Sequence, residues 1–204
     1  MSANDNSVNI DPVKRGYHHG DLRVALVKAG LELLEQRSAD SLSLREVART
    51  VGVSATAVYR HFPDKHSLLK ALSLEGLKQL AAQQGAAVAL PSGEGFAESG
   101  RAYVRFALAN PGLFRLIFTT SLFANHDVRD DPQGSAGWLL RSHVAKALGV
   151  GASDEQQRAL TYRAWALVHG LAMLILDRQI DREDGLLLLG QIVSTSIVGV
   201  QDAT

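Results

Sequence analysis

The sequence predicts an all-α protein, and three features of its 204 residues lead to that prediction. Apolar residues recur at spacings of three and four along most of the chain, which is the period of an amphipathic helix. The apolar–polar alternation typical of strands is absent from the sequence. Capping residues and glycine or proline breaks divide the chain into separate segments. We therefore expect a three-helix front, a connecting helix and a larger helical bundle.

The front of the chain predicts a flexible arm followed by a three-helix unit. Asp21 is expected to cap a first helix with a single apolar stripe. Ser43 stands three residues before Glu46 in a capping-box pattern, which opens a short second helix. The expected divisions are the arm (residues 1–16), the three-helix unit (17–64) and the remaining helical part (65–204).

A tight turn joins the second expected helix to a very short third one. Gly52 can adopt the left-handed conformation that ends a helix, and Ser54 caps the third helix. Two short helices joined in this way have the spacing of a helix-turn-helix motif, here residues 43–62. A connecting helix follows over about residues 65–84, and further helices are expected at about residues 96–109, 111–120, 134–148, 153–179 and 183–200.

The composition excludes several classes of protein. Without cysteine, the chain has no disulfide, no thiolate zinc or iron–sulfur site and no cysteine nucleophile. The longest apolar stretches are interrupted by His169 and Asp177, so we expect no membrane-spanning segment. The N-terminus also lacks the pattern of a secretory signal. These features predict a soluble, cytoplasmic protein.

The net charge of zero conceals an uneven distribution. Residues 13–70 hold ten basic and six acidic side chains, an excess of four positive charges, and four of the seven histidines. Residues 71–204 hold eleven basic and thirteen acidic side chains, and residues 1–12 add two acidic ones. Such asymmetry points to nucleic-acid contact by the basic front.

The polar side of residues 43–62 suits the major groove of DNA. That groove admits a helix and is read by small and polar side chains near the helix N-terminus. Arg60 can reach a guanine edge or a phosphate. The start of the connecting helix places its backbone N–H groups and Lys65 where another phosphate would lie. The alternative is a solvated polar face on a small bundle. The expected DNA contacts are Ser43, Arg45, Ser54, Ala55, Thr56, Tyr59, Arg60, His61 and Lys65.

Basic and aromatic residues also gather just before the first helix, at Lys14, Arg15, Tyr17, His18 and His19. They form either an arm that follows the phosphates or a minor groove, or a solubilising tail. The paired histidines have no third ligand at a suitable spacing, so we expect no metal site.

The same front residues resemble the TetR family of bacterial transcriptional regulators. The resemblance lies in Leu42–Ala48, the Gly52–Ser54 turn and the block Val58–Leu69, within residues 17–70, about a quarter of the chain. It implies a homodimeric DNA-binding protein, usually a repressor, with a helical C-terminal domain that binds a ligand. The resemblance therefore assigns residues 65–204 to ligand binding and dimerisation.

A second resemblance concerns the C-terminal part. Tyr103–Thr119 and Trp165–Leu171 are similar to a TetR-like C-terminal domain named for a Trp-His-Gly motif. Aromatic residues of these segments are candidates to line a ligand pocket, although each also suits an ordinary core. The candidates are Phe106, Phe114, Phe118, Trp165 and His169.

The last two expected helices carry small residues at helical spacing among large apolar ones. Small residues permit close helix approach, and apolar neighbours drive association in water. Two helices from each subunit would form a four-helix dimer interface, whereas the alternative is packing within one subunit. The candidates for the interface are Ala166, Gly170, Leu174, Leu187, Gly190, Ser194 and Ile197.

These features lead to a functional hypothesis. We expect a ligand-responsive repressor that binds a pseudo-palindromic operator in double-stranded DNA as a homodimer and is released by a small-molecule effector. Neither a nucleophile elbow, a His-Glu-x-x-His pair nor a Walker loop occurs in the sequence, so we expect no enzyme and no cofactor. The alternatives are a helical-bundle carrier or enzyme, and a DNA-binding dimer without an inducer.

Overall fold

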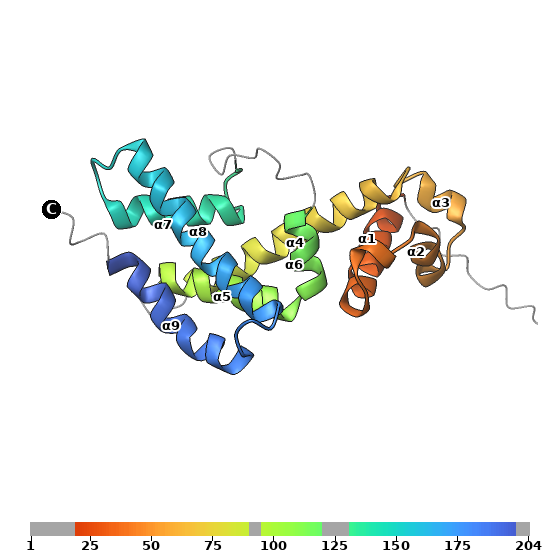
Figure 1. The fold of residues 1–204 in the computed structure, drawn as a ribbon. Coiled ribbons are helices and arrows are strands. Elements are labelled where there is room, and N and C mark those ends of the chain that lie inside the picture. Colours follow the sequence, from red (N-terminus) through yellow and green to blue (C-terminus); the bar gives the residue numbers. More distant parts are fainter. Residues whose placement is uncertain (1–18, 90–94, 120–130, 199–204) are drawn as a thin grey trace, which may run out of the picture.

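The computed structural model describes residues 19–89, 95–119 and 131–198. Within these ranges, side chains are described from Leu22 to Val193. The described residues form helices and no strand. Figure 1 shows a three-helix unit at one end, the bundle at the other, and a long helix joining them. The all-α prediction is thereby confirmed. The elements are α1 (His19–Gln36), the 3₁₀ helix η1 (Ala39–Ser41), α2 (Leu44–Val51), α3 (Ala55–Tyr59), α4 (Lys65–Val88), α5 (Gly95–Ala109), α6 (Pro111–Thr119), α7 (Ala136–Leu148), α8 (Asp154–Leu176) and α9 (Arg182–Val198).

The capping residues of α2 and α3 lie where the sequence predicted them. The Ser43 side chain accepts a hydrogen bond from the Glu46 backbone N–H, and the Ser54 side chain accepts one from the Ala57 N–H, each at 3.3 Å. Gly52 ends α2 in the left-handed conformation with φ at 77°, which a residue with a Cβ rarely adopts. These contacts define both short helices of the motif.

Several helix boundaries differ from the predicted ones. α1 begins at His19, so Asp21 lies inside the helix and is not its cap. The short helix η1 between α1 and α2 was not predicted. α8 ends at Leu176, three residues earlier than expected, and Arg178 adopts a left-handed φ of 56° just beyond it. α4 extends to Val88 rather than to about residue 84.

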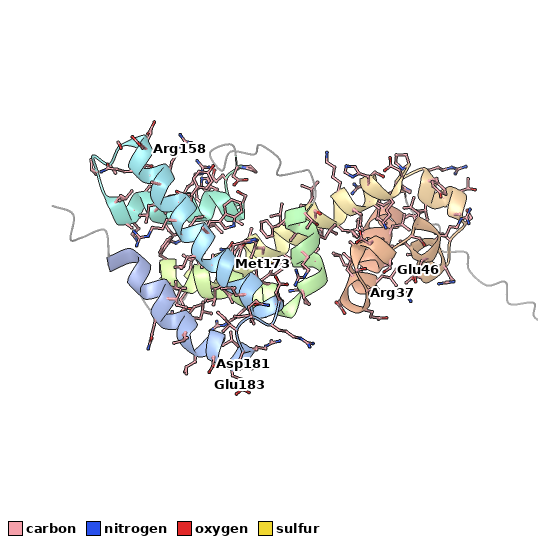
Figure 2. All side chains as sticks on the ribbon, in the orientation of Figure 1. Arg37, Glu46, Arg158, Met173, Asp181 and Glu183 are labelled. Carbon is pink, nitrogen blue, oxygen red and sulfur yellow. The ribbon has the colours of Figure 1, made fainter. Side chains whose placement is uncertain are left out.

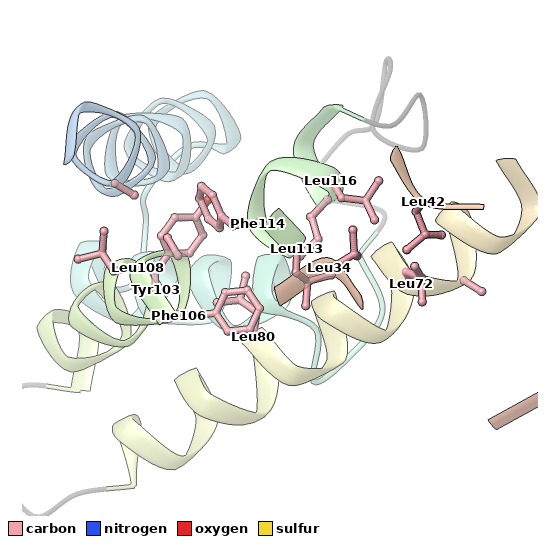
Figure 3. Close-up of a cluster of buried hydrophobic side chains, with 14 of the residues drawn as sticks. Leu34, Leu42, Leu72, Leu80, Tyr103, Phe106, Leu108, Leu113, Phe114 and Leu116 are labelled. Atoms are coloured by element: carbon pink, nitrogen blue, oxygen red, sulfur yellow. The ribbon is translucent and has the colours of Figure 1, made fainter. Parts of the chain in front are cut away.

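One continuous apolar core joins the front unit to the bundle. Figure 3 shows Leu34 of α1 beside Leu113 of α6, with Leu72 of α4 nearby. A Cβ added to Gly112 would lie 2.5 Å from the Leu34 carbonyl oxygen, so the start of α6 approaches the backbone of α1 closely. The front unit therefore contacts the bundle through α6 as well as through α4.

Among the described residues, α8 alone is long and apolar enough to cross a membrane, with a mean hydropathy of 1.4 over 18 residues. The sequence analysis expected no such segment. A core helix of a soluble protein satisfies the same criterion. Within the structure α8 packs against α5, α7 and α9, and its first turn carries Asp154 and Glu155. The expected arm, residues 1–16, lies outside the described residues.

Candidate DNA-binding surface and ligand cavity

The short helix α3 is held against the front unit by apolar side chains. Val47 of α2 and Val58 of α3 are fully buried, and Phe62, which follows α3, is 1% exposed. The Arg23 guanidinium of α1 lies 5.2 Å from the centre of the Phe62 ring, within the range of a cation–π contact. These contacts fix the orientation of α3 relative to α1 and α2.

Most of the residues expected to contact DNA are exposed. The exposed set is Ser43, Arg45, Ser54, Ala55, Thr56, Tyr59 and Arg60, while His61 and Lys65 are half-buried. Within the part of the chain that the structure describes, neither Arg45 nor Arg60 forms an ion pair, so both guanidinium groups are available to a partner. The DNA contacts of all nine residues remain predictions.

The start of α4 differs from what the sequence suggested. We expected its backbone N–H groups and Lys65 to face a phosphate, but the Asp64 carboxylate already accepts the Ser67 N–H at 2.7 Å. That hydrogen bond lowers the pKa of Asp64 and keeps a negative charge at the helix start. Lys65 Nζ donates to the Asp40 carbonyl oxygen at 2.5 Å. A phosphate contact by Lys65 therefore requires another of its three N–H donors.

An ion-pair cluster fixes α2 beside the end of α1. Figure 2 shows Arg37 and Glu46 close together at the end of the molecule that carries the motif. The Arg37 guanidinium donates to Glu46 Oε1, and Arg49 lies 3.8 Å from the same oxygen. The Glu46 side chain is largely shielded from solvent, so this pair is worth more than an ordinary surface salt bridge.

The bundle contains a mostly apolar cavity of about 120 Å³ between α4, α5, α7 and α8. Phe118 and Trp165, two of the five predicted pocket residues, line this cavity. Leu80 and Gln84 of α4 line it as well, so the helix that carries the front unit also forms part of the cavity wall.

The other three predicted pocket residues do not line the cavity. Phe106 and Phe114 are completely buried and belong to the core, where Phe114 packs edge-on against Tyr103 at 5.5 Å between ring centres. Phe106 and Leu80 belong to the same core cluster, in which Figure 3 labels both. His169 contacts Tyr103, with its Nδ1 atom 2.9 Å from the Tyr103 hydroxyl oxygen. Ligand contact by Phe106, Phe114 and His169 stays a prediction, since helical periodicity does not distinguish a cavity wall from the core behind it.

Tyr103, which was not among the pocket residues predicted from the sequence, organises the aromatic wall. Trp165 Nε1 can only donate, and it does so to the Tyr103 hydroxyl at 3.1 Å. The Tyr103 hydroxyl oxygen also lies 2.9 Å from His169 Nδ1, and the tautomer of His169 decides which of the two groups donates this hydrogen bond. Burial lowers the pKa of His169 and raises that of Tyr103 well above its usual value, so both groups are neutral at pH 7.

Removing this hydroxyl should destabilise the bundle. In Tyr103→Phe, the Trp165 N–H and His169 Nδ1 lose their shared partner, which should cost about 1–3 kcal/mol and lower the melting temperature by about 2–4 °C per kcal/mol. Thermal unfolding followed by circular dichroism measures the effect. Tyr162→Phe is the matched control, since Tyr162 is exposed on the same helix as Trp165 and should melt like the wild type. Equal melting of Tyr103→Phe and Tyr162→Phe would contradict the role given to the hydroxyl.

The predicted dimer residues fall into three groups. On α8, Ala166 and Leu174 are exposed, and a Cβ added to Gly170 would meet no atom of the described residues within 4 Å. On α9, Leu187 is 78% exposed, whereas a Cβ on Gly190 would lie 3.8 Å from Arg101 of the same subunit. The side chains of Ser194 and Ile197 lie outside the described residues. An interface role for these residues remains a prediction, and Gly190 faces its own α5.

Two family models match the chain. Residues 26–72 match the family described as "Bacterial regulatory proteins, tetR family", and residues 96–186 match "Tetracyclin repressor-like, C-terminal domain". The first match contains the helix-turn-helix motif, and the second contains the cavity residues Tyr103, Phe118 and Trp165.

Solved structures with the same fold cover nearly the whole chain. A protein of unknown function from Rhodococcus sp. RHA1 is 29% identical, with a TM-score of 0.69, over 91% of this chain and 98% of that chain. A tetR-family transcriptional regulator from Streptomyces coelicolor is 25% identical, with a TM-score of 0.69, over 90% and 83% of the two chains. TetR from Acinetobacter baumannii AYE, at 18% identity and a TM-score of 0.65, shares the fold over 91% and 97%.

These comparisons agree with the geometry of the two ends of the molecule. One end carries a helix-turn-helix motif with an exposed third helix, and the other carries a bundle of the matching C-terminal type. Both family domains point to a non-enzymatic DNA-binding regulator and not to the carrier or enzyme considered from the sequence. Soluble regulators of this family act in the cytoplasm. The chain belongs to the TetR family of bacterial transcriptional regulators.

Proposed function

We propose that the protein is a repressor that binds a pseudo-palindromic operator as a homodimer and leaves it when a small molecule enters the bundle. One observation carries this proposal. The single helix α4 begins beside the exposed helix α3 and ends at the wall of the cavity. A movement of α4 at the cavity would therefore also move the DNA-binding end of the molecule.

The exposed apolar residues of α8 and α9 support a dimer. Leu174 is 44% exposed and Leu187 is 78% exposed, and Leu186 and Leu188 beside it are also exposed. Large exposed apolar patches on soluble proteins mark interaction sites. A second copy, related by a twofold axis, would cover both surfaces at once and place two copies of α3 at successive half-sites.

The proposed release works through α4 and α6. A ligand in the cavity would favour a position of α4 in which the two α3 helices no longer match the half-site spacing. The close approach of Gly112 to Leu34 gives α6 a second contact with the front unit. Coupling of this kind is reciprocal, so operator DNA must weaken ligand binding by the same factor. Identical operator affinity with and without the effector would refute induction.

The lining of the cavity supports a small-molecule effector. Ligand sites are concave and mostly apolar with a few placed polar groups, as this cavity is. A TetR variant from Acinetobacter baumannii AYE, which shares the fold at 18% identity and a TM-score of 0.63, was solved in complex with minocycline. A chain of this fold can therefore hold a small molecule.

The decisive experiment is selection of bound DNA from a random pool by the full-length protein. We expect an enriched sequence with two inverted half-sites about one helical turn, or about 10 base pairs, apart. Enrichment of a single, non-repeated site would contradict binding as a twofold dimer. Recovery of no sequence above background would contradict the operator itself.

Two substitutions separate base reading from phosphate contact. If Arg60 reads a base, Arg60→Ala should cost about 1–3 kcal/mol at one operator position and little elsewhere. Lys65→Ala should weaken binding to all sequences and reduce the slope of log affinity against log salt by about one unit. Titrations with operator variants at several salt concentrations measure both effects.

The matched controls are Arg158→Ala and Lys146→Ala, which remove exposed cations from α8 and α7, at the opposite end of the molecule (Figure 2 labels Arg158). Both controls should bind the operator like the wild type. If Arg60→Ala lost the same affinity for every operator variant, Arg60 would contact a phosphate and not a base. If the salt slope of Lys65→Ala were unchanged, Lys65 would not contact a phosphate.

A further inference from the structure

Gln84 is a buried polar residue in a mostly apolar cavity. It stands on α4, is 5% exposed and lines the cavity together with Trp165, Phe118 and Tyr103. Buried polar side chains are normally hydrogen-bonded at every polar atom, so the partners of its amide group indicate its purpose.

The orientation of the Gln84 amide is fixed by Ser99 of α5. Gln84 Nε2 donates to the Ser99 carbonyl oxygen at 3.3 Å and to Ser99 Oγ at 3.1 Å. A carbonyl oxygen can only accept, so a flipped amide would place two acceptors against each other. The nitrogen therefore faces Ser99, and Oε1 must point elsewhere.

Gln84 Oε1 is buried, and no donor among the described residues reaches it. The other prominent polar atoms of the wall are already engaged, because Trp165 Nε1 donates to the Tyr103 hydroxyl and that hydroxyl faces His169. Leaving a carbonyl acceptor unpaired costs about 1–3 kcal/mol, which the folded protein carries in the absence of a partner.

We infer that Gln84 is the recognition residue of the effector and accepts a hydrogen bond from it through Oε1. This inference rests on the proposed function, since it identifies the chemical class that the proposed cavity selects. The effector is a small, mostly apolar, uncharged molecule with an aromatic or aliphatic body and one N–H or O–H donor. The apolar wall and the Asp131 carboxylate at its edge disfavour an anion.

The position of Gln84 also connects recognition with release. It stands near the end of α4, and the start of the same helix adjoins α3. A donor bound to Oε1 while its apolar body contacts Trp165 of α8 would tie α4 to the opposite wall of the cavity. An equally apolar molecule without a donor would fill the space but would lack this tie.

The test uses pairs of probes that differ only in the donor. Indole and indene share size and shape, but indole alone carries an N–H, and phenol and toluene form a second pair. Binding to the full-length protein is measured by calorimetry and by the shift in melting temperature. One net hydrogen bond corresponds to an affinity difference of about two- to tenfold, so we expect indole and phenol to bind more tightly by that factor.

Gln84→Met removes the acceptor and keeps an unbranched side chain of similar length. In this variant the preference for the donor-bearing probe should disappear, with indole and indene binding equally. Gln83→Met is the matched control, since Gln83 is exposed, lies on the same helix and should leave the preference unchanged. Without ligand, Gln84→Met should melt close to the wild-type temperature, because the gain from removing an unpaired buried acceptor opposes the loss of the two hydrogen bonds to Ser99.

Three results would overturn the inference. In the first, the wild type binds none of the four probes. In the second, the wild type binds the two probes of a pair equally well. In the third, Gln84→Met still prefers the probe that carries a donor. A lower melting temperature of Gln84→Met with unchanged probe preference would make Gln84 a structural residue. Operator binding is measured separately, in the DNA selection. Failure of the Gln84 inference therefore leaves the repressor proposal intact, and failure of operator binding leaves the probe-binding result intact.

Discussion

Replacing Leu174 and Leu187 together by glutamate is expected to convert the protein from a dimer to a monomer. Light scattering after size exclusion should show the mass falling from twice the chain mass to the chain mass of 21.9 kDa. The physical reason is that both leucines are exposed in the single subunit and lie in the proposed interface, where a dimer would bury them. Two glutamates on each subunit would place four charges in an apolar interface, where unpaired charges are strongly unfavourable.

The same double substitution should weaken operator binding on the order of 100-fold or more. A dimer binds its second half-site intramolecularly, at an effective concentration far above that of a free subunit, and a monomer loses this advantage. Affinity for a single isolated half-site should change little, because α8 and α9, which carry the substituted residues, lie in the bundle and α3 lies at the other end of the molecule (Figure 1).

Leu74→Glu provides the control for this experiment. Leu74 is 47% exposed on α4, outside the predicted interface, so the same chemical change there should leave both mass and operator affinity intact. A double variant that remains a dimer would locate the interface elsewhere. A monomer that retains full operator affinity would contradict the proposal that the two subunits bind DNA together.

The front unit was predictable because its signals are local. Ser43, Gly52 and Ser54 each act within three or four residues of their own position, through a side-chain cap or a left-handed turn. Sequence spacing alone therefore located α2, the turn and α3. The boundary at Asp21 was wrong because a good capping residue can also stand in the first turn of a helix that begins earlier.

The cavity was less predictable because its geometry depends on residues far apart in the chain. The hydrogen bonds from Tyr103 to Trp165 and His169 span 62 and 66 positions, and no local sequence pattern indicates them. Phe106 and Phe118 stand in the same aromatic set, yet only Phe118 lines the cavity. Gln83 and Gln84 are adjacent identical residues, and only the packing of α4 against α5 buries one and exposes the other.

Phe62→Ala is expected to have the largest effect on stability in the front unit. Phe62 is 1% exposed and packs beneath Arg23, so its loss leaves a cavity between α3 and α1. Truncating a buried phenylalanine to alanine costs about 3–5 kcal/mol, the sum of the lost transfer free energy and the cavity. For a chain of this length the melting temperature should fall by about 6–20 °C.

The temperature dependence of operator binding separates this effect from a lost DNA contact. Phe62 is buried and is not expected to contact DNA, so at temperatures where Phe62→Ala remains folded its operator affinity should be close to that of the wild type. Arg60→Ala should instead bind weakly at every temperature, because Arg60 is exposed and its loss removes a contact without loosening the core.

Phe62→Leu is the conservative variant, and it should recover most of the lost stability because it fills most of the space with another apolar side chain. If Phe62→Ala bound the operator weakly even when fully folded, then the orientation of α3, and not only its stability, would depend on the ring. Calorimetric unfolding and binding titrations at 10 °C and 30 °C distinguish these outcomes, because only an altered orientation of α3 would persist in the cold.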